Sequence, residues 1–129
     1  MTVAGLVLAG LAALVHVYIF YLESIVWTSA KARAIFGTGS AEQAGAMKDL
    51  AFNQGFYNLF LALVTAIGIV ATAAGAVTIG LTMVFVGTGS MVAAGLVLLL
   101  SSPSKAAAAL KQLVLPAFAI VVLVIGVVR

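Results

Sequence analysis

The sequence has no cysteine, only two prolines and very little charge. Without cysteine, the chain can form neither a disulfide nor a thiolate metal site. Charged residues make up 7% of the 129 residues and hydrophobic residues 65%. This balance excludes a water-soluble domain, whose surface needs many more polar side chains. The net charge of +3 is too thinly spread to indicate a nucleic-acid-binding surface, so the composition is that of an integral membrane protein.

Four apolar runs are each long enough to cross the roughly 30 Å hydrocarbon layer of a membrane as a helix. They cover approximately residues 3–27, 50–73, 78–100 and 106–128. The turns after the second and third runs are short, and short turns place consecutive helices side by side and antiparallel. The sequence therefore predicts one all-α domain over residues 1–129, an up-down bundle of four transmembrane helices.

The longest connection, between the first two runs, carries information on helix ends and on topology. Within it, Ser40 is followed three residues later by Gln43, and this capping-box pattern predicts that a helix begins there. Five of the six basic residues fall on the side of the membrane that carries this connection; they are Lys31, Arg33, Lys48, Lys105 and Lys111. Since basic residues favour the cytoplasmic side, we expect a protein of the cell (cytoplasmic) membrane with both termini outside.

The first run places two ionisable residues, His16 and Glu23, on the same helical face as a stripe of small residues. This face comprises Gly5, Ala9, Ala13, His16, Phe20, Glu23 and Trp27. Small residues favour contacts between helices, and ionisable groups avoid lipid, so we expect the face to point into the bundle. Two helical turns, about 10 Å, separate His16 from Glu23, and the two side chains should not touch.

The second run begins with an unusually polar stretch, AFNQGFYN at residues 51–58. Its polar side chains are Asn53, Gln54, Tyr57 and Asn58. They are costly to bury in hydrocarbon, and Gly55 removes bulk beside them. In an antiparallel hairpin, Glu23 should lie at the depth of the first two polar residues and His16 at the depth of the last two. We therefore predict a polar pocket between the first two helices.

These two helices also carry motifs that resemble a known family. The first motif is H-x-Y-I-x-Y-L-E-x3-W, and the second is NQGxYN. Their residues are His16, Tyr18, Glu23 and Trp27, then Asn53, Gln54, Gly55, Tyr57 and Asn58. The pattern resembles small bacterial and fungal membrane proteins known as domain of unknown function 1304. The resemblance covers most of the chain and implies a four-helix membrane protein, but it implies no activity.

Three functions are compatible with the predicted pocket. In the first, the pocket opens toward the inner leaflet or cytoplasm and binds a small amphiphilic or lipid-like molecule. Glu23 and His16 then supply protonatable groups, while the polar residues of the second helix orient the ligand. In the second, the protein is a proton-coupled exporter and a dimer, in which Glu23 alternates between proton and substrate. In the third, it is an accessory subunit whose polar residues only hold the helices together.

Four residues are expected to support the site: Tyr18, Trp27, Gly55 and Lys111. Of these, Lys111 lies near the start of the fourth run and could reach Glu23. No enzyme motif is present, and whether chemistry follows binding stays open. We predict no cofactor and no metal, because one histidine and one glutamate two turns apart make a poor metal site. The expected partners are membrane lipid, a small amphiphilic ligand and, in the exporter, a second copy of the chain; nucleic acid is not expected.

Overall fold

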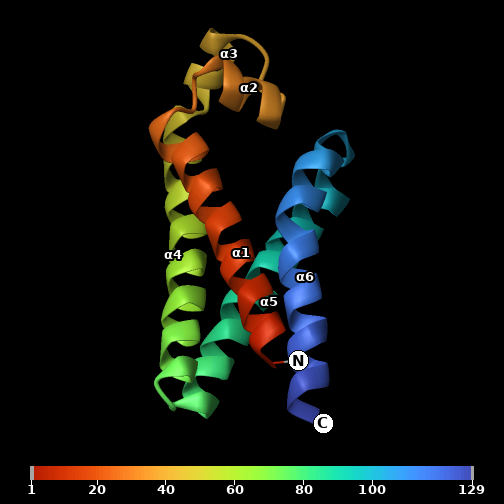
Figure 1. Ribbon diagram of the computed structural model, residues 1–129. Helices are drawn as coiled ribbons and strands as arrows, with labels where there is room; N and C mark the ends of the chain where they lie inside the picture. The colour runs from red at the N-terminus through yellow and green to blue at the C-terminus, as the bar shows by residue number, and fades with distance from the viewer. Residues whose placement is uncertain (1, 129) are drawn as a thin grey trace.

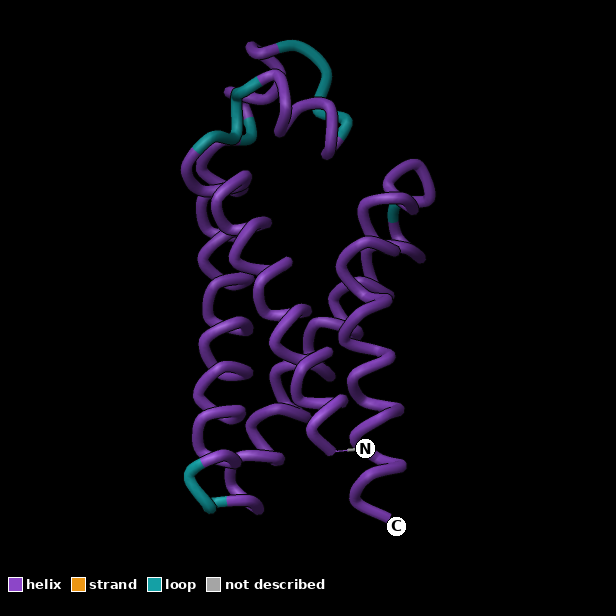
Figure 2. The backbone as a smooth tube through the Cα atoms, viewed as in Figure 1, coloured by secondary structure: helices purple, strands orange, loops and turns teal. Residues whose placement is uncertain are grey.

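The computed structural model describes residues 2–128, and almost all of them are helical (Figures 1 and 2). In chain order the elements are α1 (Thr2–Phe20), a π-helical turn (Tyr21–Ile25), α2 (Ala30–Phe36), α3 (Ala41–Ala46), α4 (Lys48–Ala73), α5 (Val77–Ser101), a 3-10 turn (Pro103–Lys105) and α6 (Ala106–Val128). Within the described residues there is no strand, so the predicted all-α class is confirmed.

Four of the helices are long and apolar enough to cross a membrane. They are α1 together with its π-helical turn, α4, α5, and α6 together with the preceding 3-10 turn. The prediction of four membrane-spanning helices is therefore confirmed, and the protein is a membrane protein. The predicted first span reached residue 27, whereas the helix ends at Ile25, because the chain then turns toward α2.

The four long helices form a ring in which α1 packs against α4 and α6, and α5 packs against the same two helices. Figure 1 shows that the pair α1 and α4 separates from the pair α5 and α6 toward the end that carries α2 and α3. Both chain ends lie at the opposite end, where the helices converge. The bundle is thus tightly packed at one end and open at the other.

Small residues bring the backbones together at the packed end. A Cβ atom added to Gly68 of α4 would lie 2.7 Å from the carbonyl oxygen of Gly80 in α5, which is closer than real Cβ atoms approach. Gly5 of α1 lies against α6, where a Cβ atom would meet mainly the side chain of Leu123. Because glycine alone fits at Gly68 and Gly80, α4 and α5 cross here with backbone against backbone.

Helices α2 and α3 lie beside the open end and are fixed by local capping. Ser40 and Gln43 form the predicted capping box: the Ser40 backbone N–H donates to Gln43 Oε1 at 2.8 Å, and the Gln43 N–H donates to Ser40 Oγ at 3.2 Å. The indole of Trp27 donates to the carbonyl oxygen of Ala44 at 2.8 Å and packs against the ring of Phe36. Trp27 therefore joins the end of the first membrane span to both short helices.

Candidate functional site

Glu23 lies in the π-helical turn that ends the first membrane span, and only 8% of its surface is exposed. A π-helical turn widens the helix by one residue and frequently occurs at functional sites. Here the Asn58 side chain of α4 donates its amide hydrogen to Glu23 Oε2 at 2.8 Å. The same amide nitrogen donates to the carbonyl oxygen of Gln54 at 3.1 Å. Asn58 thus holds the Glu23 carboxyl group of the π-helical turn close to the backbone of α4 at Gln54.

Gly55 allows this close approach of α4 to the π-helical turn. A Cβ atom at Gly55 would lie 3.1 Å from the Cβ atoms of both Glu23 and Ser24. The Ser24 hydroxyl donates to the carbonyl oxygen of Phe52 at 2.9 Å. The space beside Gly55 is therefore filled by Ser24, and the expectation that this glycine leaves room beside the polar residues is wrong.

The predicted inward face of the first helix is largely confirmed by burial. Its buried members are Gly5, Ala9, Ala13, His16, Glu23 and Trp27. Phe20 is half-buried and packs edge-on against Phe56 of α4, with 5.1 Å between ring centroids. The small-residue stripe and the two ionisable residues thus point into the bundle together.

His16 is almost fully buried, with 1% of its surface exposed, but it is not among the residues that line the cavities of the open end. Its Nδ1 atom lies 2.9 Å from the carbonyl oxygen of Ala12, one turn earlier. A carbonyl oxygen only accepts, so Nδ1 carries the hydrogen and donates it. Nε2 has no hydrogen-bond partner in the described chain. Asn58, which we expected at the depth of His16, instead binds Glu23.

A polar cavity of about 550 Å³ lies between the two separated helix pairs. From the π-helical turn and α4, its polar lining residues are Glu23, Gln54, Tyr57 and Asn58. From the end of α5 through the start of α6, they are Ser101, Lys105 and Gln112. The rest of its wall is mostly apolar, so the cavity combines polar groups with hydrocarbon on one surface.

Beside this polar cavity, a second and more open hollow of about 470 Å³ lies against α4. Glu23, Gln54 and Tyr57 line both, whereas Asn53 lines only the second. Five of the six predicted ligand-binding residues thus surround two adjoining spaces, and His16 lies outside both.

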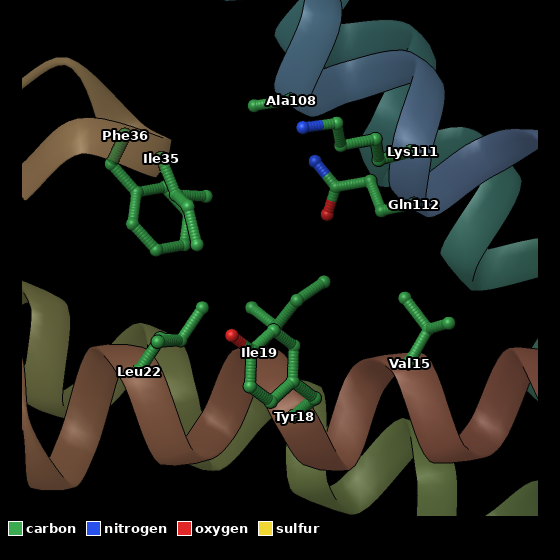
Figure 3. A pocket seen from close by; sticks show the side chains of 9 residues that line it. All are labelled: Val15, Tyr18, Ile19, Leu22, Ile35, Phe36, Ala108, Lys111 and Gln112. Atoms are coloured by element: carbon green, nitrogen blue, oxygen red, sulfur yellow. The ribbon is translucent and has the colours of Figure 1, made fainter. Parts of the chain in front are cut away.

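Lys105 and Gln112 were missed as lining residues, although the sequence contains a signal for them. They are seven residues apart at the start of the fourth span, and that spacing places both on one helical face. Lys111, which from its place in the sequence could reach Glu23, lines a different and more apolar cavity, shown in Figure 3. Glu23 does not line that cavity.

Among residues 2–128, no three histidine, cysteine or acidic side chains converge as they would around a metal ion. A family model described as a protein of unknown function, DUF1304, matches residues 10–124. The chain belongs to the DUF1304 family. The match confirms the resemblance seen in the two sequence motifs, and it includes Glu23, the polar stretch of α4 and the lysines of the third connection and α6. Neither a curated protein nor a solved structure matches this DUF1304 chain.

Proposed function

We propose that this DUF1304 protein binds a small amphiphilic or lipid-like molecule in the polar cavity between its helix pairs. The observation that carries the proposal is the cavity itself, which places Glu23, Gln54 and Tyr57 opposite the apolar side chains of Val97 and Leu98. Its volume of about 550 Å³ is in the range of roughly 300–1,000 Å³ that is typical of small-molecule sites. A ligand with both a polar and an apolar part matches such a wall.

The hydrogen bonds indicate which groups are left for a ligand. Asn58 already uses its amide nitrogen for Glu23 Oε2 and for the carbonyl oxygen of Gln54. The second carboxyl oxygen of Glu23, the amide of Gln54 and the hydroxyl of Tyr57 remain to bind a polar head group. Asn58 is then a positioning residue, and the other three are the proposed ligand contacts.

Removing one proposed contact should release the ligand while the fold survives. Gln54→Leu is expected to reduce a co-purified small-molecule adduct several-fold, because Gln54 is exposed to the cavity and its side chain supports no other residue. The measurement is native mass spectrometry of protein extracted gently from membranes, together with the melting temperature. Thr82→Val in α5 is the matched control, since it also removes an exposed polar group but lies away from the cavity.

An adduct that persists unchanged in Gln54→Leu would contradict binding in this cavity. If the wild-type protein carries no adduct and binds none, the accessory-subunit interpretation gains support. A proton-coupled exporter stays a distinct alternative, because Glu23 is a buried carboxyl group that lines two adjoining spaces. It requires that substrate drives proton flux in liposomes and that Glu23→Gln abolishes this flux.

We also propose that the open end faces the cytoplasm and that the protein resides in the cytoplasmic membrane. The basic residues at this end support the orientation. The chain has no natural cysteine, so single cysteines report topology without background. We expect Glu42→Cys and Ser104→Cys to react with an impermeant thiol reagent only from the cytoplasmic side, and Ala74→Cys only from the outside. The reverse pattern would refute the orientation, and an even split would indicate insertion in both directions.

A further inference from the structure

A third cavity at the open end has walls of a different character from the polar cavity. This slot, of about 340 Å³, lies between α1, α2 and α6. Its apolar walls come from Val15, Ile19 and Leu22 on one side and from Ile35 and Phe36 of α2 on another (Figure 3). No acidic side chain of the described residues lines it.

Two polar side chains project into this slot from α6, and the Tyr18 side chain of α1 also lines it. Figure 3 shows Lys111 and Gln112 pointing from α6 into the space that faces Ile19. Lys111 supplies a positive charge, and Gln112 supplies an amide that can donate hydrogen bonds. The nitrogen-bearing side chains of the slot therefore lie on its α6 wall, whereas the α1 wall offers hydrocarbon apart from the hydroxyl of Tyr18.

The charge of Lys111 has no acidic counterpart in the slot. The chain has three acidic residues. Glu23 lines the polar cavity and its bond to Asn58 is directed toward α4. Glu42 and Asp49 lie in α3 and at the start of α4, and both are exposed. Lys111 is exposed, and no acidic side chain among the described residues lines the slot beside it, so charge complementarity at this wall favours an anionic ligand.

A second cation lies next to the slot. The ammonium nitrogen of Lys31 lies 5.5 Å from the ring centroid of Tyr18, and Tyr18 lines the slot. The neighbouring Tyr18 side chain raises the pKa of Lys31, and the ordinary pKa of lysine already lies far above neutral, so this side chain is positively charged. The positive potential near the mouth of the slot thus comes from two helices, α2 and α6.

We propose that the slot binds a single-chain amphiphile with an anionic head group, such as the carboxylate of a fatty acid. The head group contacts Lys111 and Gln112, and the alkyl chain lies along Val15 and Ile19. The volume of about 340 Å³ is near the lower end of the roughly 300–1,000 Å³ usual for small-molecule sites, which suits one chain and not two. This site adjoins the polar cavity proposed above, and Phe36, Ala108 and Gln112 line both, but Lys111 lines only the slot and Glu23 only the polar cavity of the two.

The test uses a photoreactive fatty acid and the corresponding fatty alcohol, which carry the same diazirine in the chain. Both are added to the protein in phosphatidylcholine liposomes at about pH 9, well above the ordinary range of carboxyl pKa values. Cross-linked peptides are then mapped by mass spectrometry. Labelling of Leu100, which is 80% exposed, serves as the reference for the amount of probe in the bilayer.

We expect the fatty acid to label residues 15–22 in preference to Leu100, and the alcohol to show no such preference. Lys111→Met should lower the preference of the acid about tenfold, as expected when one charge-assisted contact is lost. Lys111→Arg keeps the positive charge and should therefore retain the preferential labelling by the fatty acid. Lys105→Met is the matched control, because Lys105 lines only the polar cavity.

The proposal fails if acid and alcohol label the slot equally, or if Lys105→Met reduces labelling as much as Lys111→Met. It also fails if excess acetate displaces the fatty acid, since the site would then recognise a free anion and not an amphiphile. Gln54→Leu separates this proposal from the proposed function: it should leave slot labelling unchanged even where it removes the ligand of the polar cavity.

Discussion

Asn58→Leu is expected to lower the free energy of unfolding by about 1–3 kcal/mol, the range for leaving a buried polar group without its partner. Asn58 donates to the Glu23 carboxyl at 2.8 Å, and both side chains are buried. Leucine removes the donor, while the carboxyl group stays in the bundle. The double variant Glu23→Leu with Asn58→Leu should be more stable than the sum of the two single changes predicts, because no polar group is then left unpartnered.

The measurement is thermal unfolding in detergent of the wild type, the two single variants and the double variant. Asn53→Leu is the control: it is the same substitution on the same helix, but Asn53 is exposed. We expect its effect to stay within about 0.5 kcal/mol, as for most exposed substitutions. If Asn53→Leu destabilises the protein as much as Asn58→Leu, the loss reflects added hydrophobic bulk and not the bond to Glu23. Strictly additive single effects would likewise show that the two side chains do not interact.

The sequence was sufficient to predict the features that depend on local pattern. The four spans follow from continuous apolar runs, and the capping box of Ser40 and Gln43 follows from a three-residue spacing. The inward direction of Glu23 follows from the small residues on its face. Each of these signals is contained within a single helix or turn, so no knowledge of the other helices was needed.

Features that depend on how the helices cross were not predictable in the same way. Matching depths along a regular antiparallel hairpin placed Asn58 level with His16, but Asn58 binds Glu23, which lies in a π-helical turn that no such count anticipates. The separation of the helix pairs places Lys111 in the slot and Lys105 in the polar cavity. Nothing in the sequence of α6 alone determines which cavity each lysine lines.

The different packing of the two ends suggests how the cavities are maintained. At the packed end, Ala9, Val84, Ala119 and Leu123 form a fully buried apolar core beside the glycine crossings. At the open end, the polar cavity and the slot occupy the space between the diverging helices. Because the angle between the helix pairs is set where their backbones touch, a change at the crossing should alter both cavities as well as stability.

Among changes at the packed end, Gly80→Leu is expected to have the largest effect on stability and on the shape of the cavities. A Cβ atom at Gly80 would lie 2.7 Å from the carbonyl oxygen of Gly68 and would also meet the backbone of Thr72. Backbone atoms cannot rotate aside as side chains do, so α4 and α5 must move apart. Forcing bulk into a packed contact costs typically 1–3 kcal/mol and occasionally more, and we expect this variant to lose about 3 kcal/mol or more.

Gly89→Leu provides the matched comparison, because Gly89 lies in the same helix and a Cβ atom there would meet nothing within 4 Å. Leucine also favours helix formation over glycine by up to about 1 kcal/mol, so Gly89→Leu should be neutral or stabilising. Thermal unfolding in detergent measures the stability of the two variants. Native mass spectrometry reports whether each still carries the ligand proposed for the polar cavity. Equal stability of the two variants would show that α4 and α5 do not depend on the contact between Gly68 and Gly80. If Gly80→Leu remains folded but loses the adduct, while Gly89→Leu retains it, the crossing at the packed end determines the shape of the cavity at the open end.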